Sequence, residues 1–110
     1  MKIKNISQNI SITDSAKEAV SVSDRVFGLL NPNSSRFLVI KTHFGIHTFF
    51  MSGKIDVIVL DKKGSVAKLK DNLSPNSFFF YNPLHSTVIE MPPGSITEFS
   101  IHQNDKIYIG

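Results

Sequence analysis

Short apolar runs, each followed by turn residues, fill the chain from residue 36 to residue 91 and restrict its fold more than any other feature. The runs are RFLVIK (36–41), IHTFFM (46–51), IDVIVLD (55–61), SFFFY (77–81) and STVIEM (86–91). Runs of this kind, bounded by turn signals and rich in β-branched and aromatic residues, are typical of strands. The run at 55–61 is apolar on both faces, so we expect a central strand there.

The turns between these runs carry signals of their own. The DKKG segment (61–64) joins the central run to SVAKLK and ends in Gly64, whose freedom to adopt positive φ suits a hairpin. Pro83, Pro92 and Pro93 each close a strand. We therefore predict a β-hairpin over 61–64, in which Asp61 bonds within the turn.

The two ends of the chain add further strands and two short helices. Isoleucines separated by polar residues predict a strand pair at the N-terminus: Ile3, Ile6, Ile10 and Ile12. Ser21 with Asp24 resembles a capping box and predicts a helix over 22–30, and the PPGS segment predicts one helical turn through Phe99. The sequence thus predicts a mainly β (β-rich α+β) fold, a small barrel-like or half-closed β-domain of six to eight short strands with one or two short helices.

Length and composition point to a single domain over residues 1–110, since 110 residues fit one core of ordinary size. Six of the nine phenylalanines lie between Phe44 and Phe80, so we expect the core to be centred there. Without cysteine there is no disulfide, thiolate metal site or cysteine nucleophile. Neither a signal peptide nor a membrane span is visible, so we expect a soluble, cytoplasmic protein.

The charge balance is mildly basic, with a net charge of +3 and a pI near 9.3. The lysines cluster at Lys62, Lys63, Lys68 and Lys70. We do not expect nucleic acid as a partner, because the stacking aromatics and the basic stripe used for such binding do not coincide in the sequence. Any such binding should be weak, non-specific and sensitive to salt.

Motifs for common cofactors and catalytic groups are missing. His43 and His47 have metal-ligand spacing only on a helix, whereas extended chain places them about 13 Å apart. No phosphate-binding glycine motif and no serine-nucleophile motif occurs, so we expect neither a metal nor a cofactor. Asp56 and Glu90 stand out because each lies within an apolar strand, where an ionised group needs a partner.

Five motifs occur in an order and spacing that resemble a known family: RVFGLL (25–30), GIHTFFM (45–51), IDVIVLDKKGSV (55–66), VIEMPPG (88–94) and IHQNDKI (101–107). The chain resembles the domain of unknown function 192 family, also called uncharacterised protein family 0127. The resemblance implies a small β-rich, barrel-like domain and brings no agreed activity, cofactor or catalytic residue. The residues that match its motifs are Arg25, Gly28, His47, Thr48, Met51, Asp56, Asp61, Gly64, Glu90, Pro92 and Gly94.

Polar residues embedded in apolar motifs form the candidate ligand-binding set: Arg25, His47, Thr48, Asp56 and Glu90. We expect a binding module for a small polar ligand or a partner segment, with a cleft near residues 44–51 and Arg25 and His47 as donors. Asp56 or Glu90 would face His47 across that cleft. The alternatives are a hydrolase or lyase that uses His47 with Asp56 or Glu90 as acid and base, and weak non-specific RNA binding.

Overall fold

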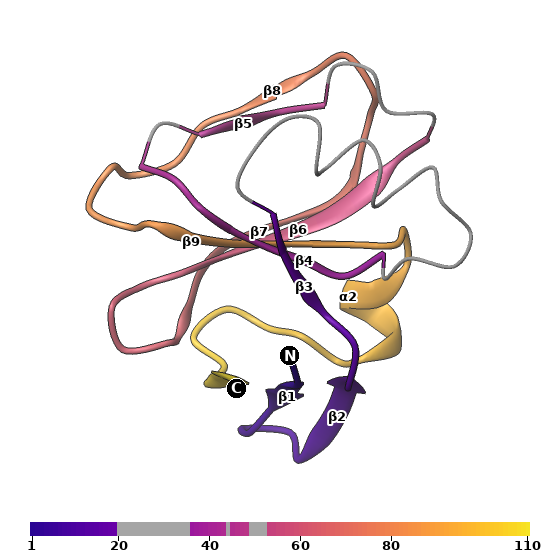
Figure 1. The fold of residues 1–110 in the computed structure, drawn as a ribbon, viewed down its shortest axis with the longest axis vertical. Helices are drawn as coiled ribbons and strands as arrows, with labels where there is room; N and C mark the ends of the chain where they lie inside the picture. The colour runs from indigo at the N-terminus through magenta and orange to yellow at the C-terminus, as the bar shows by residue number, and fades with distance from the viewer. Residues whose placement is uncertain (20–35, 44, 49–52) are drawn as a thin grey trace.

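Three sheets organise the part of the chain that this computed structural model describes, namely residues 1–19, 36–43, 45–48 and 53–110. A five-stranded sheet has the order β3-β4-β9-β6-β7 (Figure 1). Its strands are β3 (Lys17–Ala19), β4 (Leu38–Lys41), β6 (Ile55–Leu60), β7 (Val66–Leu73) and β9 (Thr87–Met91). β3 and β4 are parallel, and the other neighbours are antiparallel. All six residues of β6 are buried, which confirms the expected central strand.

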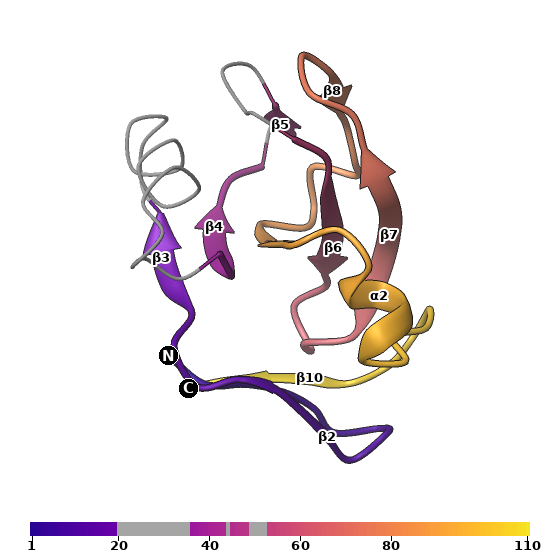
Figure 2. The same ribbon diagram turned by 90° about the vertical axis from the view of Figure 1, so that its right-hand side faces the viewer.

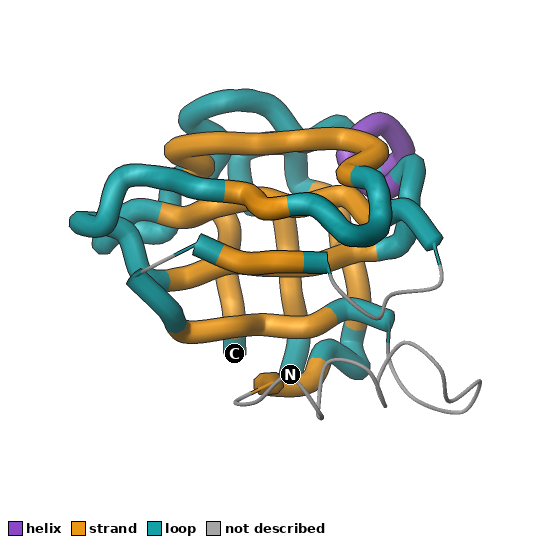
Figure 3. Tube along the Cα trace, turned by 90° about the horizontal axis from the view of Figure 1, so that it is seen from above, coloured by secondary structure: helices purple, strands orange, loops and turns teal. Residues whose placement is uncertain are grey.

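Two smaller sheets complete the architecture. A three-stranded sheet has the order β10-β1-β2, from β1 (Ile3–Asn5), β2 (Ile10–Thr13) and β10 (Ile107–Ile109), and β5 (Ile46–His47) pairs with β8 (Phe78–Phe79). Figure 2 shows these small sheets on opposite sides of the large one, and in Figure 3 the three-stranded sheet runs crosswise to it. The described residues contain one short helix, α2 (Ser95–Glu98), and no closed barrel.

Alternation along the central strands produces two cores, one on each face of the five-stranded sheet. The first core lies toward the three-stranded sheet and consists of Ile3, Ile12, Ala16, Val39, Ile58, Leu60, Val66, Ile89, Met91, Ile101 and Ile107. The second core lies toward β5 and β8 and consists of Ala19, Leu38, Ile40, Ile46, Ile55, Val57, Val59, Leu73, Phe79 and Val88. Both cores are mainly aliphatic, so β-branched residues in strands, rather than phenylalanines, fill most of the interior.

This packing corrects the expectation of a phenylalanine-centred core. Phe79 is 6% exposed, but Phe78 and Phe80 are 60% and 63% exposed. The β5–β8 sheet covers the second core with one face only, so strand alternation turns Phe79 inward and its two neighbours outward. The phenylalanines at 44, 49 and 50 lie outside the described residues.

The strand count also differs from the sequence-based expectation, while the mainly β class is confirmed. Ten strands are described in place of the six to eight expected. β5 and β8 lie within the expected runs 46–51 and 77–81, whereas β3 has the sequence Lys-Glu-Ala and carries no apolar run that would reveal it. The hairpin over 61–64 is confirmed, with Gly64 at φ 82°, and so is the helical turn after Gly94. The expected helix over 22–30 lies outside the described residues.

A buried carboxylate fastens the C-terminal turn to the three-stranded sheet. Asp105 is 7% exposed and accepts hydrogen bonds from Asn5 Nδ2 at 3.1 Å and from the His102 backbone N–H at 3.0 Å. The Gln8 side-chain amide donates a third bond at 3.4 Å. Burial alone would raise the pKa of Asp105, but the bonds from Asn5, His102 and Gln8 outweigh it and bring that pKa below its usual value.

Candidate functional site

Thr48, one of the candidate binding residues, holds a neighbouring turn in place. Its hydroxyl is fully buried, donates to the Ser74 carbonyl at 2.7 Å and accepts from the Ser77 backbone N–H at 2.8 Å. Its own backbone N–H donates to the Ser77 carbonyl at 2.9 Å. These bonds connect the end of β5 to the turn that leads into β8, which gives Thr48 a structural role in the fold.

Asp56 connects three elements through its carboxylate. Oδ1 accepts the Asn72 backbone N–H at 2.9 Å, at a bulge where Asn72 has φ 52°, and Oδ2 accepts the Ile96 backbone N–H at 2.9 Å. The helix α2 begins after Gly94 and has no side-chain cap of its own. Asp56 therefore supplies from β6 the acceptor that the first turn of α2 needs.

Glu90 lies on the opposite face of the sheet from Asp56. Glu90 pairs in register with Leu38 on one side and Val57 on the other, both members of the second core, whereas Asp56 pairs with Met91 of the first core. Cross-strand partners share a face, so the two carboxylates project in opposite directions. Both are fully buried. The structure therefore does not bring them together as a carboxylate pair.

His47 lies on β5, in register with the exposed Phe78 of β8. Its chain neighbours Ile46 and Thr48 are buried, while His47 is half-buried, as strand alternation requires for a side chain that points away from the second core. Arg25 lies outside the described residues. The described residues therefore do not complete the predicted cleft beside residues 44–51.

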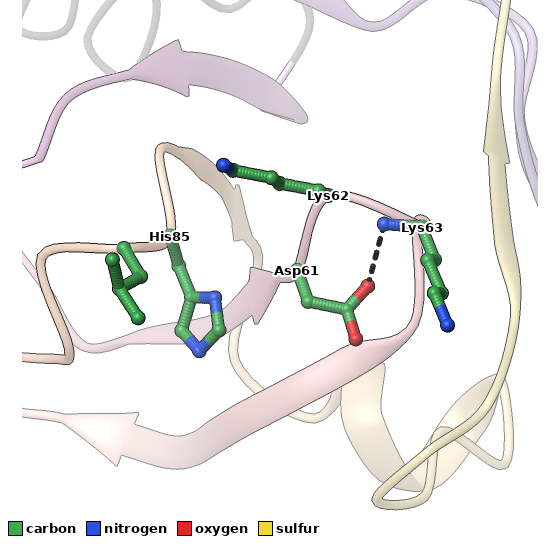
Figure 4. Close-up of a pocket in the computed structure, with 5 residues that line it drawn as sticks. Asp61, Lys62, Lys63 and His85 are labelled. Atoms are coloured by element: carbon green, nitrogen blue, oxygen red, sulfur yellow. Dashed lines mark hydrogen bonds between the residues drawn. The ribbon is translucent and has the colours of Figure 1, made fainter.

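A pocket of about 330 Å³ opens at another place, between two turns. We call it the two-turn pocket, and it is lined by Asp61, Lys62, Lys63, Leu84 and His85 (Figure 4). The last residue of β6, Leu60, pairs with the first residue of β9, Thr87. The segment after β6 and the segment before β9 therefore leave the sheet at the same edge, and their turns meet there.

The first wall is the β6–β7 hairpin turn. Asp61 Oδ1 accepts the backbone N–H groups of Lys63 and Ser65, each at 2.9 Å, and the Gly64 N–H donates to the Asp61 carbonyl at 3.0 Å. The Lys106 ammonium donates to the Lys63 carbonyl from outside the turn. With its side-chain acceptor and positive-φ glycine, this wall is rigidly built.

The second wall is the loop before β9. Asn82 Oδ1 accepts the Leu84 backbone N–H at 3.0 Å, and the Asn82 carbonyl accepts the His85 N–H at 3.0 Å. From the strand side, His43 Nδ1 donates to the Pro83 carbonyl at 2.7 Å. Because backbone bonds fix both walls, the pocket exists before any ligand arrives.

The charged and polar side chains of the lining are one carboxylate, Asp61, which bonds its own turn, and three hydrogen-bond donors, Lys62, Lys63 and His85. The Ser65 backbone bond is the main cause that lowers the pKa of Asp61, against an opposing effect of burial, and the Lys63 bond and the charges of His85 and Lys106 lower it further. Asp61 is thus ionised at neutral pH. Figure 4 shows the Lys62 side chain on the same side as His85, while the Lys63 side chain turns away. The pocket therefore presents Lys62 and His85 as donors, and Leu84 adds an apolar side chain to the lining.

Sequence reasoning did not find this pocket, although it identified Asp61 and Gly64 as turn residues. The missing information was the pairing of β6 with β9, because Lys62 and His85 are brought together only by that register. The signal in the sequence was the second turn, Asn82-Pro83, whose asparagine is suited to bonding its own backbone.

Among the described residues there is no group of three or more His, Cys, Asp or Glu side chains that could hold a metal ion. No helix in this part of the chain is long and apolar enough to cross a membrane.

Comparisons with known proteins identify a family and a fold. The DUF192 family model, described as "Uncharacterized ACR", matches residues 12–109. A crystal structure of a protein of unknown function from Novosphingobium aromaticivorans DSM 12444 is similar, with a TM-score of 0.75 and 13% identity over 98% of this chain and 82% of that chain. A protein from Sinorhizobium meliloti 1021, provisionally named a transcription regulator, has a TM-score of 0.68 and 14% identity over 97% and 89%. At such identities the likeness concerns the fold alone. No curated protein matches the chain.

Proposed function

Because the chain belongs to the uncharacterised DUF192 family, we propose its function from its own geometry: it is a binding module that holds a small anionic ligand in the two-turn pocket. The observation that carries the proposal is the chemistry of the lining. Two lysines and a histidine line the pocket, while one oxygen of the Asp61 carboxylate, Oδ1, is engaged by the backbone of its own turn. The lining thus carries two lysine charges against one carboxylate, which favours an anion.

The ligand class follows from the shape and chemistry of the walls. A carboxylate or phosphate group would bind between the Lys62 ammonium and the His85 imidazole, and the adjoining carbon atoms would contact Leu84, which is 68% exposed. The volume of about 330 Å³ lies at the lower end of the range of roughly 300–1,000 Å³ that small-molecule sites occupy. Walls fixed by backbone bonds reduce the ordering cost of binding.

A hydrolase or lyase that uses His47 with a buried carboxylate receives less support. A general base must come within hydrogen-bond reach of its partner. Asp56 bonds two backbone N–H groups and faces the first core, whereas the β5–β8 sheet that carries His47 covers the second. Glu90 faces the second core, but strand alternation turns His47 away from it. We retain Arg25 and His47 as proposed donors for a ligand beside residues 44–51.

A titration followed by amide NMR tests the binding module. We expect inorganic phosphate or acetate, added at constant ionic strength, to cause saturable shifts of the amide signals of residues 61–63 and 84–86. The double variant Lys62→Gln with His85→Gln should lose these shifts, whereas Lys17→Gln, an exposed lysine on β3, should keep them. Shifts that grow linearly with concentration and spread over all lysines would refute the pocket.

A further inference from the structure

The surface of the two-turn pocket is mainly apolar, although four of its five lining residues are polar or charged. Carbon atoms contribute most of that surface. The methylene stems of Lys62 and Lys63 and the carbon atoms of the His85 ring are available for it, since long polar side chains present apolar bodies. Leu84 adds a complete isobutyl group. A ligand that fills this pocket therefore covers carbon as well as charge.

Leu84 is held at the pocket by the backbone of its loop. The side chain is 68% exposed. The Leu84 backbone N–H donates to Asn82 Oδ1 at 3.0 Å, and His43 Nδ1 donates to the carbonyl of the preceding residue, Pro83, at 2.7 Å. The loop thus fixes an aliphatic side chain in water beside two groups that attract an anion. Covering this side chain with an apolar part of the same ligand would be favourable.

The charge of the lining limits the charge of the ligand. Asp61 lies in the wall, and its Oδ1 accepts the backbone N–H groups of Lys63 and Ser65, which keeps the carboxylate there in its ionised form. A second negative charge on a ligand would be repelled by this carboxylate. A carboxylate ligand carries one charge at neutral pH, whereas a phosphate monoester carries about 1.5 to 2. One lysine charge in excess of Asp61 therefore matches a monoanion.

The anion-binding function proposed above is the premise of a narrower assignment. We propose that the two-turn pocket takes short-chain monocarboxylic acids, with the carboxylate between Lys62 and His85 and the carbon chain against Leu84. The volume of about 330 Å³ restricts the chain to a small number of carbon atoms. Phosphate still enters the pocket, but it binds less tightly than a monocarboxylate because it has no chain to cover Leu84 and carries more charge.

A series of acids tests the carbon chain. Amide NMR of the full chain, at one pH and constant ionic strength, follows residues 61–63 and 84–86 during titration with acetate, butanoate and hexanoate. The affinity should rise about two- to fourfold for each added methylene until the chain fills the pocket. Butanamide has a carbon chain of the same length without the charge, and it should bind at least about tenfold more weakly than butanoate.

Two ligands with the same butyl body but different head groups test the charge. Butanoate should bind more tightly than monobutyl phosphate. In Asp61→Asn, which keeps a side-chain acceptor for the turn, monobutyl phosphate should gain more affinity than butanoate does. If this variant does not fold, the comparison of the two ligands on the unmodified chain still decides the preferred charge.

The contribution of Leu84 is tested by substitution. Leu84→Ala should flatten the dependence of affinity on chain length, because the added methylenes lose their contact. The matched control is Ile6→Ala, which shortens another exposed aliphatic side chain, 49% exposed and away from the pocket, and should keep the full dependence.

The outcomes separate the ligand class from the site itself. Saturable shifts with acetate but no gain with chain length, or tighter binding of monobutyl phosphate than of butanoate, would overturn the monocarboxylate class and leave the anion site in place. The same steep dependence in Leu84→Ala would overturn the assigned contact with the chain. No saturable shift with any anion would refute the anion site and the monocarboxylate class together.

Discussion

On the first-core side of the five-stranded sheet, buried carboxylates are engaged by backbone N–H groups, whereas the segment from Phe78 to His85 exposes rings and donors to solvent. Asp56 and Asp105 are examples of the first kind, and each connects segments distant in the chain. A polar residue in an apolar motif can therefore serve the fold, as Asp56 does, whereas groups that the fold leaves accessible can contact a ligand. We expect substitutions in the two regions to behave differently.

The largest effect is expected for Asp56→Ala on the first-core side. Removing the carboxylate leaves the partly buried N–H groups of Asn72 and Ile96 without their acceptor, at about 1–3 kcal/mol for each. Urea unfolding should therefore show a loss of roughly 2–6 kcal/mol in the free energy of unfolding. Asp56→Asn, which keeps one acceptor, should lose less. If Asp56→Ala is as stable as the parent, the Asp56 carboxylate does not stabilise the fold.

Asp105→Asn should cost about 1–3 kcal/mol at neutral pH, because charged acceptors make stronger bonds than amides do. The pH dependence of the free energy of unfolding shows whether the charge of Asp105 is the cause of this loss. The pKa of Asp105 is lowered in the folded state, so its stabilisation is complete above the unfolded value of 3.8 and is lost as the pH falls through the lower folded pKa. The parent should lose this stability below about pH 4, and the variant should lack that component. A variant with the parent's full acid dependence would contradict the assignment.

Gly64→Val should cost on the order of 1–3 kcal/mol through backbone strain at the hairpin. Gly64 has φ 82°, and an added Cβ would lie 3.2 Å from the Ile107 carbonyl oxygen. Gly53→Val is the matched control, because nothing lies within 4 Å of its added Cβ. Thermal melting of both variants should separate them, and a Gly64→Val protein that melts with the parent would show that the turn accommodates a side chain.

His47→Gln should have the smallest effect, within about 0.5 kcal/mol, because this half-buried side chain keeps a donor and an acceptor after the change. With the ligand in the two-turn pocket, the phosphate-induced NMR shifts should persist in this variant. Loss of those shifts at unchanged stability would indicate that the ligand binds near residues 44–51. It would also weaken the contrast between the first-core side of the sheet and the segment from Phe78 to His85. A lower melting temperature with the shifts intact would give His47 a structural role.

Local patterns were enough to predict some elements. The alternation and turn chemistry of 55–64 predict the hairpin and its glycine, and the proline-glycine signal predicts the turn of α2. The role of Asp56 depends on Ile96, forty positions away, and periodicity carries no information about such a pair. The pocket likewise depends on the β6–β9 register. The exposure of Phe78 and Phe80 depends on β8 belonging to a thin outer sheet, which hydrophobicity alone cannot indicate.

The pairing of β1 with β10 has a consequence for the order of events during synthesis. Ile3 is opposite Ile109 in register, and the backbones of Lys2 and Gly110 bond each other in both directions. Closing so long a loop is entropically costly, and folding rates fall as such contacts become more distant in sequence. β1 is synthesised before β10 and stays unpaired on this side until β10 has been made. A chain stalled before residue 107 would therefore expose one edge of β1, where chaperones or other nascent chains could pair with it.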